Sequence, residues 1–147
     1  PLMTSIPVYM TAKHRECDDV FTTAESEVAA GNWPQAAEQW QVFKDELANH
    51  FEQEEGTLFP AFEQATGMTG GPTQVMRMEH QQMRALVQDL DTALNDQDKD
   101  RYLGLSETLM VMMQQHNMKE EMMLYPMLAQ NLAQGEEIID SFKTEAK

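Results

Sequence analysis

The feature that most restricts the fold of this 147-residue chain is a sequence pattern that occurs twice. Residues 50–62 read HFEQEEGTLFPAF and residues 116–128 read HNMKEEMMLYPML. Both follow His-x-x-x-Glu-Glu-x-x-Leu-aromatic-Pro, and the positions of their histidines differ by a repeat offset of 66 (116 − 50 = 66). The same repeat offset relates His14 to His80 (80 − 14 = 66). Two copies indicate a duplicated helical hairpin, because a solenoid needs at least three repeats.

Turn signals divide the chain into long segments. Residues 31–34, 66–72 and 95–100 are rich in Gly, Pro, Asn and Asp. Between them, apolar residues recur at steps of three and four, as on the buried face of a bundle helix. We predict an all-α fold in a single domain over residues 1–147: an antiparallel up-down four-helix bundle with an internal two-fold repeat and a short C-terminal tail or helix. The predicted helices span residues 8–30, 34–65, 72–95 and 99–133.

Each predicted helix carries one histidine on its apolar stripe. In the last helix the stripe runs through Tyr102, Leu105, Leu109, Met112, His116, Glu120, Met123 and Met127. His14 precedes Ala30 by the same interval (30 − 14 = 16) as His50 follows Pro34 (50 − 34 = 16). At 1.5 Å per residue, both stand roughly 24 Å from the turn between them. The second hairpin repeats this spacing, so the histidines are expected to meet in one layer.

That layer also contains two glutamates, each four residues after a histidine and therefore on the same side of its helix. Burying so many polar groups needs compensation, since one unpaired group costs roughly 2–7 kcal/mol. Four imidazoles and two carboxylates exceed the four ligands of a closed zinc site. They favour two iron ions with oxo or hydroxo and carboxylate bridges, and manganese or zinc as substitutes. The predicted metal ligands are His14, His50, Glu54, His80, His116 and Glu120.

With these residues the chain resembles the hemerythrin-like family, the HHE cation-binding domain. The resemblance covers about residues 8–130. It rests on His14, on HFEQE at 50–54 followed by LFP, on EHQQMR from Glu79, and on HNMKE at 116–120 followed by LYP. It implies a four-helix bundle around a non-haem di-iron centre, with the same six residues as ligands.

The pattern departs from that of the oxygen-carrying members of the family. Those members have a His four residues before the histidine of the third helix, where this chain has Met76. They also have an Asp five residues after the last histidine, where this chain has Glu121. The ligand pattern is instead similar to that of the di-iron domain of iron–sulfur-centre repair proteins, which respond to nitric oxide and oxidative damage.

Three classes of function remain open from the sequence. The first is a di-iron protein that binds or reacts with O2, NO or peroxide, in a stress response or in iron-centre repair. The second is a non-enzymatic module that binds, senses or donates iron. Its partner would be a second copy of the chain in a homodimer, or an iron-recipient protein. The third is a metal-free structural bundle. The sequence assigns no catalytic residue and does not decide whether the protein is an enzyme.

Several other residues have weaker interpretations. Glu55 and Glu121 follow the predicted ligands and are expected beside them or in solvent. Glu79 could accept a ring proton from a ligand histidine. Phe51 and Tyr125 flank the layer and could line an access path. Pro60 and Pro126 should kink their helices. The 13 methionines are interpreted as core residues rather than as copper ligands.

Composition excludes further classes. The chain has 10 basic and 25 acidic residues, and this net charge of −15 argues against binding nucleic acid or anionic lipid. The single cysteine excludes an internal disulfide and a Cys-rich zinc site. No apolar run is as long as a membrane span, and no basic segment precedes the first apolar residues. We therefore expect a cytoplasmic protein that binds no membrane.

Overall fold

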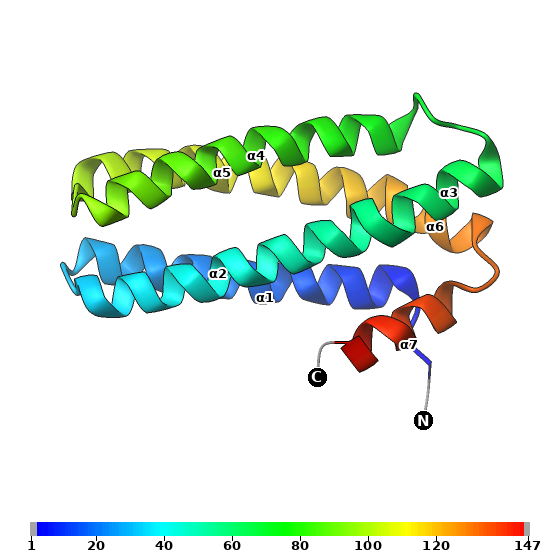
Figure 1. The fold of residues 1–147 in the computed structure, drawn as a ribbon, viewed down its shortest axis with the longest axis horizontal. Coiled ribbons are helices and arrows are strands. Elements are labelled where there is room, and N and C mark those ends of the chain that lie inside the picture. Colours follow the sequence, from blue (N-terminus) through cyan, green and yellow to red (C-terminus); the bar gives the residue numbers. More distant parts are fainter. Residues whose placement is uncertain (1–2, 146–147) are drawn as a thin grey trace.

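The computed structural model describes residues 3–145, and its regular structure there is helical. Helices α1 (Ile6–Ala29) and α2 (Trp33–Gln53) lie side by side, as do α4 (Pro72–Asn95) and α5 (Lys99–Lys119). Figure 1 shows these two pairs packed along each other's length. The prediction of an all-α bundle is confirmed. Within residues 3–145, no helix is both long enough and apolar enough to cross a membrane.

The helices begin and end at residues suited to those positions. The Ser5 hydroxyl accepts a hydrogen bond from the Val8 amide at 3.3 Å, and the Asp98 carboxylate accepts one from the Arg101 amide at 3.2 Å. Such side-chain caps satisfy amides that have no partner within the helix. Gly31, with φ of 75°, forms the tight turn between α1 and α2, where a left-handed backbone favours glycine.

Each copy of the repeated pattern contains a π-helical turn. Helix α2 continues through η1 (Glu54–Leu58) into α3 (Phe59–Thr66), and α5 continues through η2 (Glu120–Leu124) into α6 (Tyr125–Asn131). The amide of Phe59 donates to the carbonyl of Glu54, five residues earlier, and Tyr125 donates to Glu120 in the same way. A proline is the second residue after each turn, Pro60 after η1 and Pro126 after η2. The wider turn lies where the proline ring would otherwise press on the preceding α-helical turn.

The π turn changes which side chains face the core. The sequence predicts Met123 on the buried stripe, but Met123 is 62% exposed. Leu124, Tyr125 and Leu128 are buried instead. A π turn contains one more residue than an α turn, so the buried positions after it move one residue along the chain. The prediction for Met123 is wrong for this reason.

The methionines are also less buried than the sequence predicts. Met10, Met76, Met83 and Met113 are buried in the bundle. More than half of the side chain is exposed at four other positions: Met78, Met118, Met122 and Met123. The interpretation of the methionines as core residues is therefore wrong for the second group, which lies on the outer faces of helices whose inner faces are already filled.

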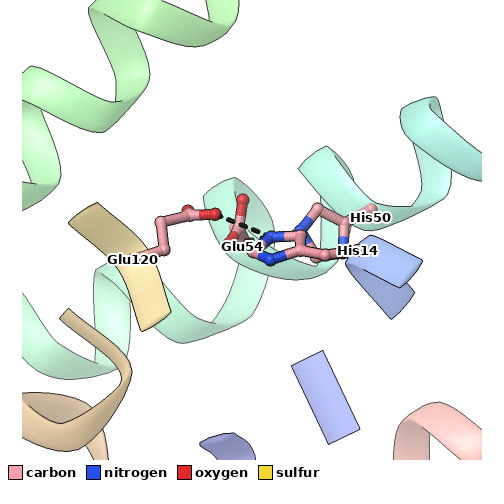
Figure 2. A group of neighbouring side chains, drawn as sticks. All are labelled: His14, His50, Glu54 and Glu120. Carbon is pink, nitrogen blue, oxygen red and sulfur yellow. Dashed lines mark hydrogen bonds and ion pairs between the residues drawn. The ribbon is translucent and has the colours of Figure 1, made fainter. Parts of the chain in front are cut away.

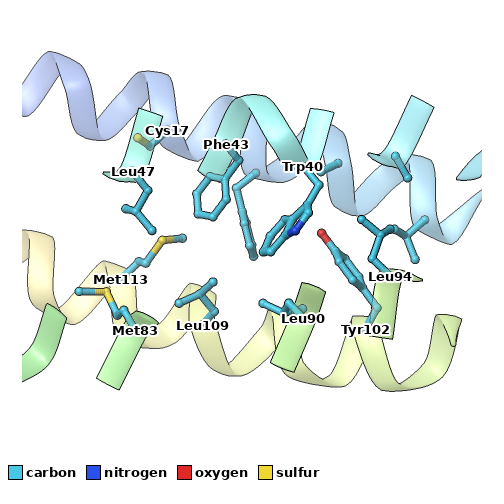
Figure 3. Close-up of a cluster of buried hydrophobic side chains, with 14 of the residues drawn as sticks. Cys17, Trp40, Phe43, Leu47, Met83, Leu90, Leu94, Tyr102, Leu109 and Met113 are labelled. Atoms are coloured by element: carbon cyan, nitrogen blue, oxygen red, sulfur yellow. The ribbon is translucent and has the colours of Figure 1, made fainter. Parts of the chain in front are cut away.

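Two apolar clusters fill the bundle on either side of a polar layer. One cluster lies toward the α1–α2 and α4–α5 turns and is shown in Figure 3; its large aromatic side chains include Phe21, Trp40, Phe43 and Tyr102. The other fills the opposite end, with Met10, Phe59, Phe62 and Leu128 among its members. Along α4, Met76 belongs to the second cluster and Met83 to the first, with His80 between them. The apolar clusters thus confine the polar layer from both ends.

The last helix, α7 (Gly135–Glu145), lies beside the first part of α1, where its buried side chains join the second cluster (Figure 1). Ile139 and Phe142 are buried there, and the Phe142 ring lies 6.2 Å from that of Tyr9. Burying each of these two side chains contributes roughly 1.5–3 kcal/mol to stability.

Candidate metal centre

The structure brings all six predicted ligand residues together in the polar layer. Each is at most 3% exposed. They form two overlapping groups, and within each group one candidate ligand atom per residue lies within 4.8 Å of all the others. The first group, drawn in Figure 2, is His14, His50, Glu54 and Glu120; the second is Glu54, His80, His116 and Glu120. Glu54 and Glu120 are shared, so each carboxylate lies between two pairs of imidazoles.

The inner nitrogens of the histidines face the shared carboxylates. The Nε2 atoms lie near a carboxylate oxygen at the following distances: 3.0 Å for His14 and Glu120, 3.5 Å for His50 and Glu54, 3.0 Å for His80 and Glu54, and 3.3 Å for His116 and Glu120. His50 and His116 each meet the glutamate four residues later on the same helix. His14 and His80 each reach a glutamate of another helix, so the layer brings together side chains of separate helices.

Three of the histidines bind a second, outer carboxylate through Nδ1. The pairs are His14 with Glu121 at 2.7 Å, His80 with Glu55 at 2.6 Å, and His116 with Glu79 at 2.8 Å. A carboxylate at Nδ1 fixes the tautomer, so that Nδ1 carries the hydrogen and Nε2 directs a lone pair toward the centre. The structure thus answers what the sequence left open for these glutamates: each one accepts from a histidine of a different helix.

Basic side chains hold the outer carboxylates in place. Arg84 donates to both oxygens of Glu55 at 3.0 Å, and the Lys119 ammonium contacts Glu79. Partial burial opposes the ionisation of Glu55, but hydrogen bonds from Arg84 and His80 bring its pKa below the usual value. Partial burial likewise opposes the ionisation of Glu79, and its hydrogen bond from Lys119 lowers its pKa in the same way. Both glutamates are therefore charged acceptors at neutral pH.

The centre of the layer is short of hydrogen-bond donors. Four buried atoms there have no hydrogen-bond partner: Glu54 Oε1, Glu120 Oε2, His80 Nε2 and His116 Nε2. His80 Nε2 and Glu54 Oε1 are only 3.0 Å apart, but the contact lacks the geometry of a hydrogen bond. Lone pairs that face each other at this distance repel unless a positive charge lies among them. Imidazole and carboxylate are also ligands that transition metals prefer, so the cluster fits the binding of metal ions.

The pKa values of the central groups also reflect how closely the buried carboxylates and imidazoles lie together. Burial and the neighbouring Glu54 carboxylate raise the pKa of Glu120 to about 7. Burial also opposes ionisation of Glu54, but the charge of His50 and hydrogen bonds from its neighbours hold the pKa of Glu54 well below its usual range. Burial lowers the pKa of His116, yet the Glu120 carboxylate outweighs it and raises that pKa to about 9. In the metal-free protein, protons supply the positive charge that a metal would supply.

Tyr125 is a central residue that the sequence placed only at the edge of the layer. Its hydroxyl donates to Glu54 Oε2 at 2.6 Å and lies 3.0 Å from Glu120 Oε1. It also lies 3.0 Å from His14 Nε2 and 3.3 Å from His50 Nε2. The hydroxyl therefore contacts every member of the first group, and its single hydrogen is donated to Glu54.

The π turn explains why Tyr125 reaches the centre. On an α-helix, Tyr125 and Glu120 would point roughly 140° apart, because each residue advances by about 100°. In a π turn, residues five apart return to the same face. A tyrosine five residues after a glutamate carries no sequence signal for this, because the π turn itself is not visible in the apolar spacing. In the other copy the equivalent residue is Phe59 (125 − 66 = 59), which has no hydroxyl and stacks 5.9 Å from His80.

Fold and site together define a helical-bundle protein whose buried His and Glu clusters fit the binding of metal ions. Residues 6–128 match the hemerythrin family model, described as the hemerythrin HHE cation binding domain. The chain therefore belongs to the hemerythrin HHE cation-binding family, as its resemblance to that family implies. All six residues of the cluster lie within the matched region. Comparisons with curated proteins and with solved structures gave no match.

Proposed function

We propose that this protein holds two iron ions in the polar layer and binds or reacts with a small molecule such as O2, NO or peroxide. The observation that carries the proposal is the pair of overlapping clusters that share Glu54 and Glu120. Each ion would be held by two imidazoles and by the two shared carboxylates. Four protein ligands leave coordination positions open on iron. Manganese or zinc could take the same places.

Bound iron would supply open coordination positions and one-electron redox chemistry. The residues of the chain would do the rest. The outer carboxylates make the imidazoles stronger donors and fix their rings. The two apolar clusters limit the access of bulk water. The Tyr125 hydroxyl has a single hydrogen, which it donates to Glu54 here, and would donate it to an oxygen-bearing group near His14 and His50 only by turning away from Glu54.

A groove of about 520 Å³ between α4 and α5 offers a route to the layer. It is lined by the candidate ligand His116 and by its outer partner Glu79. Val111 and Met112 give the groove an apolar wall, which suits an uncharged diatomic molecule. We propose that a small molecule approaches the metal positions along this groove.

We further propose that the bundle is an up-down antiparallel arrangement of two duplicated hairpins. Support comes from the repeat offset, which relates His14 to His80 and His50 to His116. The π turns η1 and η2 begin at Glu54 and Glu120, which are related by the same offset. A duplicated hairpin supplies two equal sets of ligands to one layer.

Elemental analysis and visible absorption of protein purified from iron-replete cells test the metal proposal. We expect about two metal ions per chain, and much less in the variants His50→Ala and Glu120→Ala. Glu52→Ala is the matched control, because Glu52 is an exposed carboxylate on the same helix as His50. Wild-type protein with far fewer than two metals per chain after loading would refute the proposal, as would unchanged metal content in both variants.

The second candidate is a non-enzymatic module that stores, senses or donates iron. The observation that favours it is that His50 Nδ1 is buried without any hydrogen-bond partner, so one of the candidate ligands is held less firmly than the others. Turnover separates the candidates. Catalytic consumption of NO or peroxide in the presence of a reductant would exclude the passive module, whereas stoichiometric binding alone would favour it.

A further inference from the structure

The two halves of the duplicated site differ in the side chains that surround their histidines. The repeat offset relates Glu55 to Glu121, and both accept a hydrogen bond from a histidine Nδ1. The same offset relates Glu79 to residue 13 (79 − 66 = 13), which is lysine. Glu79 accepts from His116. Lys13 cannot do the same for His50, because an ammonium group has no lone pair to offer.

The structure around His50 shows the consequence. Its Nδ1 atom is buried without a hydrogen-bond partner. Beside the ring is a small cavity of about 50 Å³, lined by Lys13, Glu46 and Gln53 among others. The Lys13 ammonium is engaged elsewhere, 3.3 Å from Glu16 Oε2 and 5.3 Å from the centre of the Tyr9 ring. Among residues 3–145, no side chain therefore accepts a hydrogen bond from His50 Nδ1.

The two halves of the layer can be named by their histidines. The first position has His14 and His50, and the second position has His80 and His116. Both histidines of the second position have an outer carboxylate, and each carboxylate is in turn held by a basic side chain, Arg84 or Lys119. In the first position only His14 has an outer carboxylate, Glu121, and the Arg15 guanidinium lies 3.6 Å from that carboxylate.

Tyr125 is a second difference between the two positions, and it also weakens metal binding at the first position. Its hydroxyl donates to Glu54 Oε2, the oxygen nearest His50, whereas Glu54 Oε1 lies nearest His80. The hydrogen bond therefore uses electron density of the oxygen that faces the first position. The equivalent Phe59 makes no such bond in the second position. Glu54 and Glu120 are shared by both positions, so their charge does not favour either one.

We propose that the two metal positions differ in affinity: the His80/His116 position fills first and keeps its ion, and the His14/His50 position exchanges its ion. This inference rests on the proposed function. An outer carboxylate raises the basicity of a ligand imidazole and fixes its ring, and loss of such a partner typically lowers metal affinity 10- to 100-fold. One missing partner therefore predicts two binding steps separated by about that factor. The exchangeable position is also the one in which Tyr125 can reach a bound molecule.

Anaerobic titration of metal-free protein with Fe²⁺ against a competing chelator tests the inference. We expect two steps in wild-type protein, and one ion retained per chain after limited chelation. Lys13→Glu supplies the missing acceptor and should strengthen the weaker step toward the stronger one. Glu79→Ala removes an acceptor from the other position and should weaken the stronger step by about 10- to 100-fold. Lys13→Met removes the ammonium without adding an acceptor and should leave both steps unchanged.

The outcomes separate this inference from the proposed function. Two ions that bind wild-type protein with equal affinity would overturn the inference and leave the metal centre intact. A weaker step that is unchanged in a correctly folded Lys13→Glu variant would also overturn it, with circular dichroism as the check of folding. Binding of no iron at all would overturn the proposed function itself.

Discussion

Replacing Tyr125 by phenylalanine tests how the polar layer is stabilised. Tyr125 is fully buried, and its hydroxyl donates to the Glu54 carboxylate at 2.6 Å. The substitution keeps the ring and its packing but removes the hydroxyl that contacts the first group of candidate ligands. Glu54, also fully buried, would lose a donor that it cannot replace with water. We therefore expect Tyr125→Phe to destabilise the metal-free protein.

The size of the effect follows from the type of hydrogen bond. A hydrogen bond to a charged group contributes about 1.5–3 kcal/mol to stability. With a denaturant slope of about 2 kcal/mol per M urea, the unfolding midpoint should fall by about 0.75–1.5 M. Equilibrium urea unfolding of metal-free protein, followed by far-ultraviolet circular dichroism, measures this shift.

Tyr102 provides the matched control. It is as fully buried as Tyr125, but its hydroxyl has no hydrogen-bond partner. Removing an unpaired buried hydroxyl costs no hydrogen bond, so Tyr102→Phe should leave the midpoint unchanged or raise it. Equal losses in both variants, or no loss in Tyr125→Phe, would refute the assignment of the Tyr125 hydroxyl as a donor within the layer.

Three further predictions concern the layer and its surroundings. The raised pKa values of Glu120 (about 7, from 4.5) and His116 (about 9, from 6.5) mean that the metal-free fold binds these protons more tightly than the unfolded chain does. The stabilisation from Glu120 is lost as pH rises from about 4.5 to about 7, and that from His116 as pH rises from about 6.5 to about 9. The urea midpoint of metal-free protein should therefore fall between pH 7 and 9 because of His116, and a rise in that interval would contradict its shift. Iron loading should raise the thermal midpoint of unfolding, by about 5–11 °C for one bound ion when free iron is at 100 times its Kd. Scanning calorimetry measures this shift, and the Glu120→Ala variant should show none if the gain comes from this site. Burial raises the pKa of Cys17 to about 12, so a thiol reagent should label Cys17 only after denaturant is added, and fast labelling of native protein would show that the α1–α2 interface opens.

Much of the centre could be predicted from local sequence. His and Glu four residues apart share a face of any helix, so His50 with Glu54 and His116 with Glu120 follow from the chain alone. The repeat offset then brings His14 and His80 to the same height. The structure places all six side chains together, and their role as metal ligands stays a prediction.

The partners of these residues could not be predicted in the same way. Glu79 is adjacent to His80 in sequence, but it accepts from His116, because its side chain points toward the next helix. Glu55 accepts from His80 rather than from its own helix. Such pairs depend on how neighbouring helices are rotated about their axes, and that rotation is set by packing rather than by the spacing of residues in one helix.

The sequence by itself determined the all-helical fold and the six polar residues of the layer, because helical periodicity places residues three and four apart on one face whatever surrounds them. Only the tertiary structure decided the rest. The π turns moved Met123 outward and Tyr125 inward, since one extra residue in a turn changes the phase of every side chain after it. Packing between helices then gave three histidines an outer carboxylate and left His50 without one, so a site that looks duplicated in sequence is unequal in three dimensions.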